Sequence, residues 1–272
     1  MENIVVGFDF SSGSANAVDL AIDIANRWHA DIHLVYVKER NEDEAPIRAE
    51  IEQRIEGVRH LFKGIDMKYY IREGKVSSEL AAQAQEDKSS LVIVGTHGMS
   101  GMKKSRIIGI NTYHTITEAT VPVLSVMEDY DFNKQLENII LPIDSTASTR
   151  QKANIAEKFA MAFGSTIHIL GLYTSDTKDI QGLVNNYAHQ VGKHLAAREI
   201  RYTTKFVDAH KNITQSTLEY ASEIKADMIV IMTEQEKSFS NLLMGSFAQQ
   251  MLNQSTIPVL SVQPKQINSE SK

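Results

Sequence analysis

The residues best suited to chemistry lie in one segment of the first half of the chain, where glycines and basic side chains occur together. Four of the 14 glycines fall within 15 positions: Gly95, Gly98, Gly101 and Gly109. Three basic residues lie among them: Lys103, Lys104 and Arg106. Glycine lets a backbone approach a bound group closely, and a helix starting near Gly109 would direct free N–H groups at an anion. The segment predicts a phosphate-binding loop, with a merely flexible turn as the alternative.

Other reactive patterns in the sequence are weaker. The segment is not a Walker A loop, because no Gly-Lys-Ser/Thr ends it at the required spacing, and it does not follow the first strand as a dinucleotide fingerprint does. The serines between Ser11 and Ser14 are more typical of a helix cap than of a pyrophosphatase phosphate loop. His189 and His194 are five positions apart, which is not the spacing that places two metal ligands on one helix face. We assign no metal ligand and no catalytic residue.

Short β-branched runs alternate with helical patterns in both halves of the chain. In the first half we expect helices near 13–28, 46–63, 76–87 and 107–118 and strands at Asn3–Phe8, Asp31–Val37, Asp66–Ile71, Ser90–Gly95 and Pro122–Val126. In the second half we expect helices near 148–163, 180–198, 212–225 and 242–253 and strands at Asn138–Ile143, Thr166–Leu172, Arg201–Val207, Met228–Met232 and Pro258–Val262. This alternation predicts an α/β fold with parallel, doubly wound sheets, whose ligands bind at the carboxyl ends of the strands. A site is therefore expected in the loops after the first and fourth strands.

The two halves repeat one another in sequence. NIVVGFD at 3–9 corresponds to NIILPID at 138–144, and VPVLSV at 121–126 corresponds to IPVLSV at 257–262. The offsets are 135 and 136 positions, so a unit of about 135 residues is duplicated. We expect two domains, residues 1–129 and residues 136–265, joined by a short polar link.

Composition excludes several classes of function. The chain has 272 residues, 42% hydrophobic and 23% charged, as in a globular protein. Up to Asp129 there are 14 Lys and Arg against 20 Asp and Glu, a net charge of −6, and the remainder carries 14 of each. Neither half has the basic excess of a nucleic-acid binder. No apolar run is long enough to span a membrane, the start lacks the basic region of a signal peptide, and no cysteine is present, so we expect a cytoplasmic protein.

Several motifs of this chain resemble those of the universal stress protein family. Gly-Thr-His-Gly at 95–98, Gly109 opening the last helix, a closing Pro-Val-Leu-Ser-Val strand and Asp9 followed by Phe10-Ser11 carry the resemblance, which covers both halves. It implies two five-stranded parallel doubly wound sheets, each with strand order 3-2-1-4-5. It also implies a pseudo-twofold contact between the two domains through their final strands, and an adenine nucleotide, ATP or AMP, as ligand.

The first-half loop departs from the family pattern in two ways. Nucleotide-binding members share Gly-x2-Gly-x9-Gly-[Ser/Thr] in this loop. Gly95 and Gly98 match, but ten residues instead of nine precede Gly109, and Ile110 stands where the family has a hydroxyl. Three nearby residues are candidates for a substitute hydroxyl: Ser100, Ser105 and Thr112.

The second-half loop departs in the complementary way. Met232 and Gln235 replace the first two glycines, whereas Gly245-Ser246 restores the spacing and the hydroxyl. Acidic residues at 234 and 236 would repel a phosphate. We therefore expect the nucleotide in the first half, and a degenerate site in the second half in which Ser246 caps its helix.

The resemblance implies a defined set of site residues. The first-half nucleotide site is expected to comprise Asp9, Val37, Gly95, His97, Gly98, Gly109 and Asn111. Asp9 would lie at the adenosine end and the backbone of Val37 would recognise adenine, although Asp9 is equally suited to cap the first helix or to do both. The vestigial counterparts in the second half are expected to be Asp144, Gly245 and Ser246.

Three functional hypotheses follow. The leading one is a stress-response protein that binds an adenine nucleotide in its first domain. The second is a module for protein interaction or for a non-nucleotide small molecule, with both loops degenerate. The third is weak ATP hydrolysis, which ranks last because no general base or metal ligand can be assigned. No nucleic acid or membrane partner is expected, and homodimer formation stays open.

Overall fold

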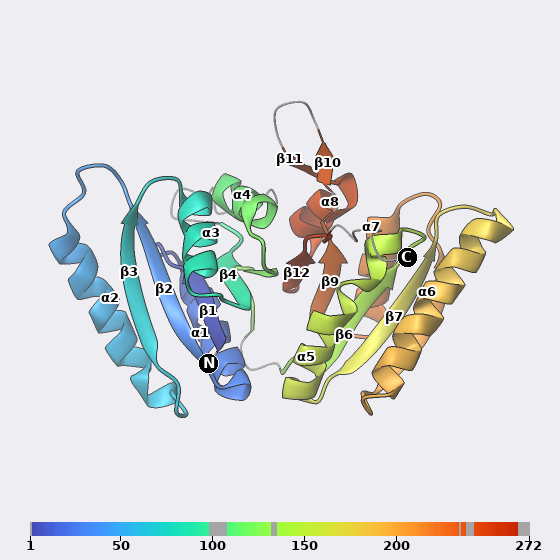
Figure 1. The fold of residues 1–272 in the computed structure, drawn as a ribbon, viewed down its shortest axis with the longest axis horizontal. Coiled ribbons are helices and arrows are strands. Elements are labelled where there is room, and N and C mark those ends of the chain that lie inside the picture. Colours follow the sequence, from blue (N-terminus) through green and yellow to red (C-terminus); the bar gives the residue numbers. More distant parts are fainter. Residues whose placement is uncertain (1, 98–107, 132–134, 234, 238–241, 266–272) are drawn as a thin grey trace, which may run out of the picture. The chain divides into compact units, whose positions relative to one another are not determined.

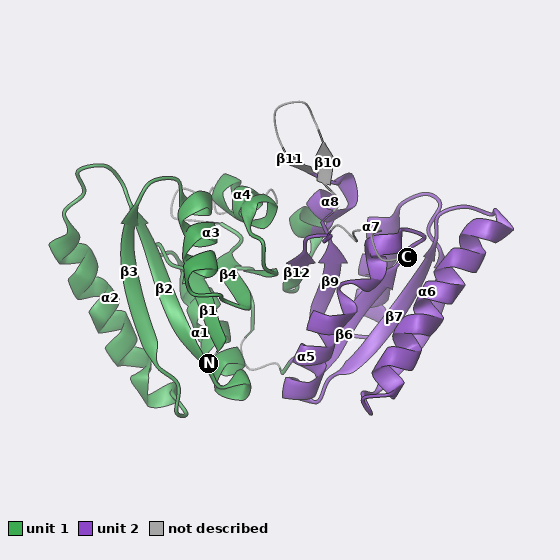
Figure 2. Cartoon of the chain, in the orientation of Figure 1, with its two compact units in different colours: residues 1–135, 252–260 green, residues 136–251, 261–272 purple. Residues whose placement is uncertain are grey.

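The computed structural model describes residues 2–97, 108–131, 135–233, 235–237 and 242–265. Contacts between Cα atoms divide the chain into two compact units, shown in Figure 2. Unit 1 comprises Met1–Gln135 with Leu252–Leu260, and unit 2 comprises Leu136–Met251 with Ser261–Lys272. The predicted loop residue Gly98, the basic residues of that loop, and Ser100 and Ser105 lie outside the described residues.

The first half alternates strands and helices as the sequence predicts (Figure 1). Its strands are β1 (Glu2–Gly7), β2 (Ala30–Lys38), β3 (Met67–Glu73), β4 (Leu91–Gly95) and β5 (Val123–Val126). Its helices are α1 (Ser12–Trp28), α2 (Glu44–Val58), the 3-10 turn η1 (Arg59–Leu61), α3 (Val76–Glu86) and α4 (Ile110–Glu118). Each predicted strand and helix of this half is present within a few residues of its expected bounds.

The second half follows the same order with three additions. Its strands are β6 (Asn138–Ile143), β7 (Thr166–Tyr173), β8 (Tyr202–Asp208), β9 (Met228–Met232) and β12 (Val259–Val262). Its helices are α5 (Ala153–Phe163), α6 (Lys178–Ala196), α7 (Ile213–Glu223) and α8 (Ser246–Gln254). The additions are the 3-10 turn η2 (Ala147–Arg150) and an antiparallel hairpin of β10 (Gln235–Lys237) and β11 (Leu242–Met244). The hairpin corrects the helix expected from residue 242, which starts at Ser246 instead.

The strands form one ten-stranded sheet in the order β3-β2-β1-β4-β5-β12-β9-β6-β7-β8, beside the separate β10-β11 pair. The prediction of two five-stranded sheets is therefore wrong in the number of sheets, whereas the predicted strand order 3-2-1-4-5 is present in each half. Within unit 1, β1 pairs in parallel with β2 and β4, which places its carboxyl end at the position where the chain order reverses. Within unit 2, β6 pairs in parallel with β7 and β9 in the same way. Reversal of the strand order opens a crevice at this end of a parallel sheet.

Burial explains why these segments fold as they do. The central strands are unbroken apolar runs, and Ile4, Val5, Leu91 and Ile93 are inaccessible to solvent, as strands covered on both faces should be. Helix α1 buries one continuous face of small and branched residues against β1 and β4. The charged stretch 39–59 forms the loop into α2 and the helix itself, whose outer face carries local ion pairs such as Arg59–Glu56 at 2.8 Å.

Candidate functional site

A cavity of about 90 Å³ lies at the carboxyl ends of β1, β2 and β4 in the first half. Five of the seven predicted site residues line it: Asp9, Val37, Gly95, His97 and Asn111. Apolar side chains from α3 and the strands form its wall: Val35, Val76, Leu80 and Val94. Gly109 directly precedes α4, whose first turn brings Asn111 to the cavity. The sixth predicted residue therefore adjoins this cavity, and the seventh, Gly98, is not described.

Asp9 organises the turn between β1 and α1. Its Oδ1 accepts hydrogen bonds from the backbone N–H of Ser11 at 3.2 Å and from the Ser11 hydroxyl at 2.5 Å. The N-cap of α1 is Ser11, whose Oγ accepts from the N–H of Ser14 at 3.1 Å. The hypothesis that Asp9 caps the helix is therefore wrong, and the assignment of the serines as caps is confirmed. Asp9 lies two residues before the N-cap, and its hydrogen bonds hold the capping Ser11 in place.

Glycine at position 95 is required by packing. A Cβ added to Gly95 would lie 2.7 Å from the carbonyl carbon of Gly13 and 3.0 Å from the N–H nitrogen of Ser14. A Cβ on Gly109 would lie 3.1 Å from the carbonyl oxygen of Thr96. Both contacts are with backbone, which has little freedom to move. The end of β4 thus approaches the first turn of α1 as closely as it does because neither Gly95 nor Gly13 has a side chain.

The hydroxyl chemistry of this site differs from the expectation. Thr112 is buried, and its Oγ1 donates to the carbonyl oxygen of Gly95 at 2.8 Å. A hydroxyl has one proton to donate, so this bond leaves Thr112 able only to accept from a ligand. Its proton is therefore already used within the protein, and at the family's hydroxyl position Ile110 is 67% exposed. His97 contacts the Oγ1 of Thr96 through its Nδ1 at 3.1 Å.

The second half repeats the turn and holds a cavity of about 130 Å³. Oδ1 of Asp144 accepts from the N–H of Thr146 at 2.8 Å and from its hydroxyl at 2.6 Å. The N–H of Asp144 donates to the Thr149 hydroxyl at 3.3 Å, and the N–H of Asp9 donates to the Ser14 hydroxyl at the same distance. All three residues expected to be vestigial line this cavity: Asp144, Gly245 and Ser246.

A buried lysine distinguishes the second cavity from the first. Lys152 lines it, is 3% exposed and donates from Nζ to the Thr149 hydroxyl at 3.1 Å. At the offset of 135 that aligns Asp144 with Asp9, its counterpart is the fully buried Ala17. Met232 also lines the second cavity where the first has glycine. Our sequence analysis missed Lys152, although a charged residue aligned with the apolar face of α1 was the available signal.

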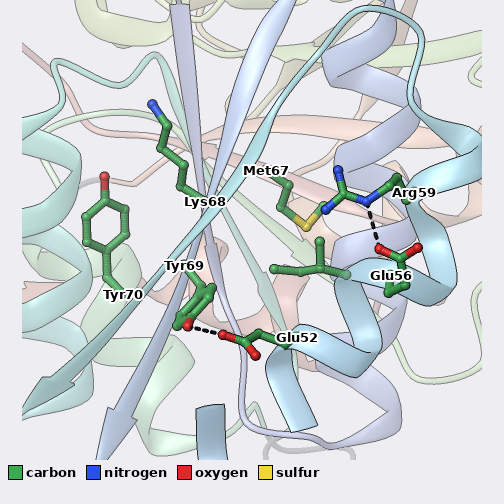
Figure 3. A pocket seen from close by; sticks show the side chains of 8 residues that line it. Glu52, Glu56, Arg59, Met67, Lys68, Tyr69 and Tyr70 are labelled. Atoms are coloured by element: carbon green, nitrogen blue, oxygen red, sulfur yellow. Dashed lines mark hydrogen bonds and ion pairs between the residues drawn. The ribbon is translucent and has the colours of Figure 1, made fainter. Parts of the chain in front are cut away.

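A wider, more open groove of about 630 Å³ lies between α2 and β3 (Figure 3). None of the predicted site residues lines it. Its polar groups bind one another: the Tyr69 hydroxyl donates to Glu52 at 2.6 Å, and Arg59 pairs with Glu56 at 2.8 Å, as Figure 3 shows. The hydrogen bond to Glu52 raises the pKa of Tyr69 above its ordinary value of 10.0. We assign this groove no ligand.

In the part of the chain that the structure describes, no three His, Asp or Glu side chains come together in a group able to hold a metal ion. Among the same residues, no helix is both long enough and apolar enough to cross a membrane.

The fold and the two cavities define a class of protein. It is a tandem α/β protein in which each half carries an aspartate-centred turn and a cavity at the carboxyl ends of parallel strands. The sequence profile of the universal stress protein family matches residues 1–126 and again residues 135–263. The chain therefore belongs to the universal stress protein family, as a tandem of two such domains.

Known proteins of this family resemble either one half or the whole chain. The universal stress protein YxiE of Bacillus subtilis is 28% identical over 149 residues, covering 45% of this chain and 97% of its own. The universal stress protein A homolog 1 of Coxiella burnetii is 27% identical over 139 residues, covering 46% of this chain and 95% of its own. A universal stress protein structure from Archaeoglobus fulgidus covers 96% of this chain and 98% of its own at 16% identity, with a TM-score of 0.77, and so shares the tandem fold.

Proposed function

We propose that this chain is a cytoplasmic stress-response protein that binds an adenine nucleotide in its first domain. The observation that carries the proposal is the convergence of Asp9, Val37, Gly95, His97 and Asn111 on one cavity. These residues come from four separate segments of the chain, and their types fit the parts of a nucleotide. A carboxylate suits ribose hydroxyls, an apolar strand end suits a base, and a helix N-terminus suits phosphate.

The first domain is a better candidate than the second for two reasons. Its cavity is lined by Gly95, where the second cavity has the side chain of Met232. The second cavity is also lined by the long side chain of Lys152, whose ammonium group is already hydrogen-bonded to Thr149 within the protein. The second domain is proposed to complete the tandem without holding a nucleotide. Occupancy of the first domain would favour one conformation or partner of the protein during stress.

Isothermal titration calorimetry with ATP and with AMP tests the proposal, using two matched variants. Asp9→Asn removes the charge but keeps an Oδ1 acceptor for Ser11, so the turn is retained. Asp144→Asn makes the same change in the same turn of the second domain. Because a hydrogen bond to a charged group contributes about 1.5–3 kcal/mol, Asp9→Asn should weaken binding about tenfold or more.

The two variants distinguish binding in the first domain from binding in the second. The proposal expects heat of binding with wild type, a large loss in Asp9→Asn and wild-type affinity in Asp144→Asn. Wild-type protein that gives no heat with either nucleotide would remove the nucleotide from the function and support the interaction module instead. Loss of binding in Asp144→Asn alone would move the site to the second domain.

A further inference from the structure

Strand β8 ends the sheet order in the second half, and β7 is its one neighbour among the described strands. Its backbone directions follow from two hydrogen bonds. The N–H of Ile167 donates to the carbonyl of Arg201 at 2.9 Å, and the N–H of Ala209 donates to the carbonyl of Tyr173 at 2.9 Å. In a parallel pair, both backbone groups of every second residue face the neighbouring strand. The even-numbered residues of β8 therefore direct their N–H and C=O groups away from β7.

The side chains of these outward residues include two exposed aromatic rings. Tyr202 is 40% exposed and Phe206 is 39% exposed, and Thr204 lies midway between them. The Phe206 ring lies directly over Gly171 of β7, where a Cβ would come within 2.2 Å of it. It stacks on Tyr173 with 5.5 Å between ring centroids and 10° between ring planes. The Tyr202 ring lies against Gly192 of α6, where a Cβ would come within 3.0 Å.

These contacts fix the rings before any partner arrives. Glycine in the middle of a strand or helix costs roughly 0.5–1 kcal/mol relative to alanine. Here Gly171 and Gly192 provide the space in which Phe206 and Tyr202 lie. An aromatic side chain already held in place loses little freedom on binding, which favours association. The edge therefore presents a rigid aromatic surface together with backbone hydrogen-bonding groups.

The usual protection of a sheet edge is weakened at β8. Exposed edges are commonly blocked by lysine, whose charge opposes pairing with another strand. The one lysine of β8, Lys205, is instead bound to Glu223 through its Nζ at 2.7 Å. Its ammonium group also lies 4.8 Å from the centre of the Tyr220 ring. The lysine charge is thus directed onto α7, and the other charged residue of β8, Asp208, lies at the end of the strand and pairs with His210.

We propose that β8 is a dimerisation edge, at which two copies of this chain pair their β8 strands in antiparallel fashion about a twofold axis at Thr204. In this register Thr204 lies opposite the partner's Thr204, and Tyr202 lies opposite the partner's Phe206. Only outward-facing residues meet in the hydrogen-bonded positions, as antiparallel pairing requires. Each of these aromatic residues is directly opposite an aromatic residue, which is a favourable cross-strand combination.

A second copy fits this edge better than an unrelated strand. Tyr202 and Phe206 are equally distant from Thr204, so the chain itself supplies the complementary pattern in the correct register. A twofold contact uses the same surface on both copies and closes after two. The result is a defined dimer, with no further open β8 edge on which to grow.

Single-cysteine variants test the register, because the chain contains no cysteine. In a hydrogen-bonded antiparallel pair the two Cα atoms are about 5.5 Å apart, within the range a disulfide bridges. Thr204→Cys should therefore form a covalent dimer rapidly under mild oxidation. Thr203→Cys is the matched control, because the two copies of residue 203 would be on the order of 8 Å apart and out of reach. Equal cross-linking of the two variants would overturn the proposed register.

Sedimentation equilibrium tests the dimer itself. The apparent mass of wild type should rise from 30.4 kDa toward twice that value with concentration. Thr204→Pro removes an outward N–H that β7 does not use, and proline is tolerated at such edge positions. It should weaken dimerisation about tenfold or more, whereas Thr204→Val, which keeps the N–H, should dimerise like wild type. Far-UV circular dichroism checks that each variant is folded.

Phe206→Lys provides a second route should the proline variant not fold. This variant keeps every backbone hydrogen bond to β7 and places an unpaired charge between the two β8 strands of the proposed dimer. It should therefore also be monomeric. Wild type that remains at 30.4 kDa at all concentrations would overturn the proposal and leave the edge to a foreign strand. So would a folded Thr204→Pro or Phe206→Lys variant that dimerises as wild type does.

Discussion

Gly95→Ala is predicted to destabilise the first unit in the absence of any ligand. In the family pattern, this glycine is expected to make room for a phosphate group. In the structure the space is already occupied by backbone, since an added Cβ would lie 2.7 Å from the carbonyl carbon of Gly13. Ordinary contacts at this position start at 3.4 Å, so the end of β4 and the first turn of α1 must separate by about 0.7 Å (3.4 − 2.7).

The magnitude follows from the nature of the contact. Inserting a methyl group into a packed region typically costs about 1–3 kcal/mol when the backbone has to move. For a unit of this size the denaturant slope in urea is about 1–3 kcal/mol per molar. The unfolding midpoint of Gly95→Ala should therefore fall by roughly 1 M urea. Gly57→Ala is the matched control, because nothing lies within 4 Å of a Cβ there and the residue is exposed within α2.

Tryptophan fluorescence measures the effect in the correct half of the chain. Trp28 is the only tryptophan and ends α1 in unit 1, so its signal follows the unfolding of that unit. Gly57→Ala should raise the stability of the helix by about 0.5–1 kcal/mol, the opposite sign to Gly95→Ala. A Gly95→Ala midpoint equal to or above that of wild type would refute the packing argument and restore the view that this glycine serves only a ligand.

Three further outcomes are expected. Burial lowers the pKa of His168 below its ordinary value of 6.5. Below pH 6.5 the unfolded chain therefore binds more protons than the folded chain, and the stability of the second unit should fall. Circular dichroism melts at pH 7.5 and 5.5 should show this loss in wild type and a smaller loss in His168→Gln. Thr112→Val removes the hydrogen bond to Gly95 and should lower the free energy of unfolding of the first unit by about 1 kcal/mol, measured by Trp28 fluorescence. An unchanged free energy of unfolding would indicate that the hydroxyl is free for a ligand. Gly171→Ala should displace the Phe206 ring and weaken dimerisation in sedimentation runs while costing the fold little, because a ring yields more readily than backbone; unaltered dimerisation would count against the role of that ring.

Much of the fold was predictable because it depends on local patterns. Unbroken apolar runs and helical periodicity located the strands and helices, and the internal repeat allowed each half to check the other. The hairpin of β10 and β11 was missed because the short apolar run at 242–244 fits a helix as well as a strand. The single ten-stranded sheet was missed because pairing between distant strands leaves no local signal.

The candidate site was predictable in position but only partly in chemistry. Strand ends and glycine spacing predicted the segments that line the first cavity. The roles of single atoms depend on contacts between segments, so the hydrogen bond from Thr112 to Gly95 and the contact of Gly95 with Gly13 could not be foreseen. Lys152 was missed for a different reason: its burial is set by the neighbours of α5, whereas a lysine in sequence normally indicates a surface.

The bond from the Gly109 N–H to the Thr96 carbonyl, at 2.9 Å, has a consequence for how this family can vary. It joins the two ends of the segment that carries the loop motif, so the path between them can change in length without moving either β4 or α4. The entropic cost of closing a segment grows only with the logarithm of its length, and one extra residue among about a dozen costs under about 0.1 kcal/mol. The tenth residue between Gly98 and Gly109 is thus nearly neutral for folding. The length of this interval is therefore a poor guide to whether the loop can bind a ligand.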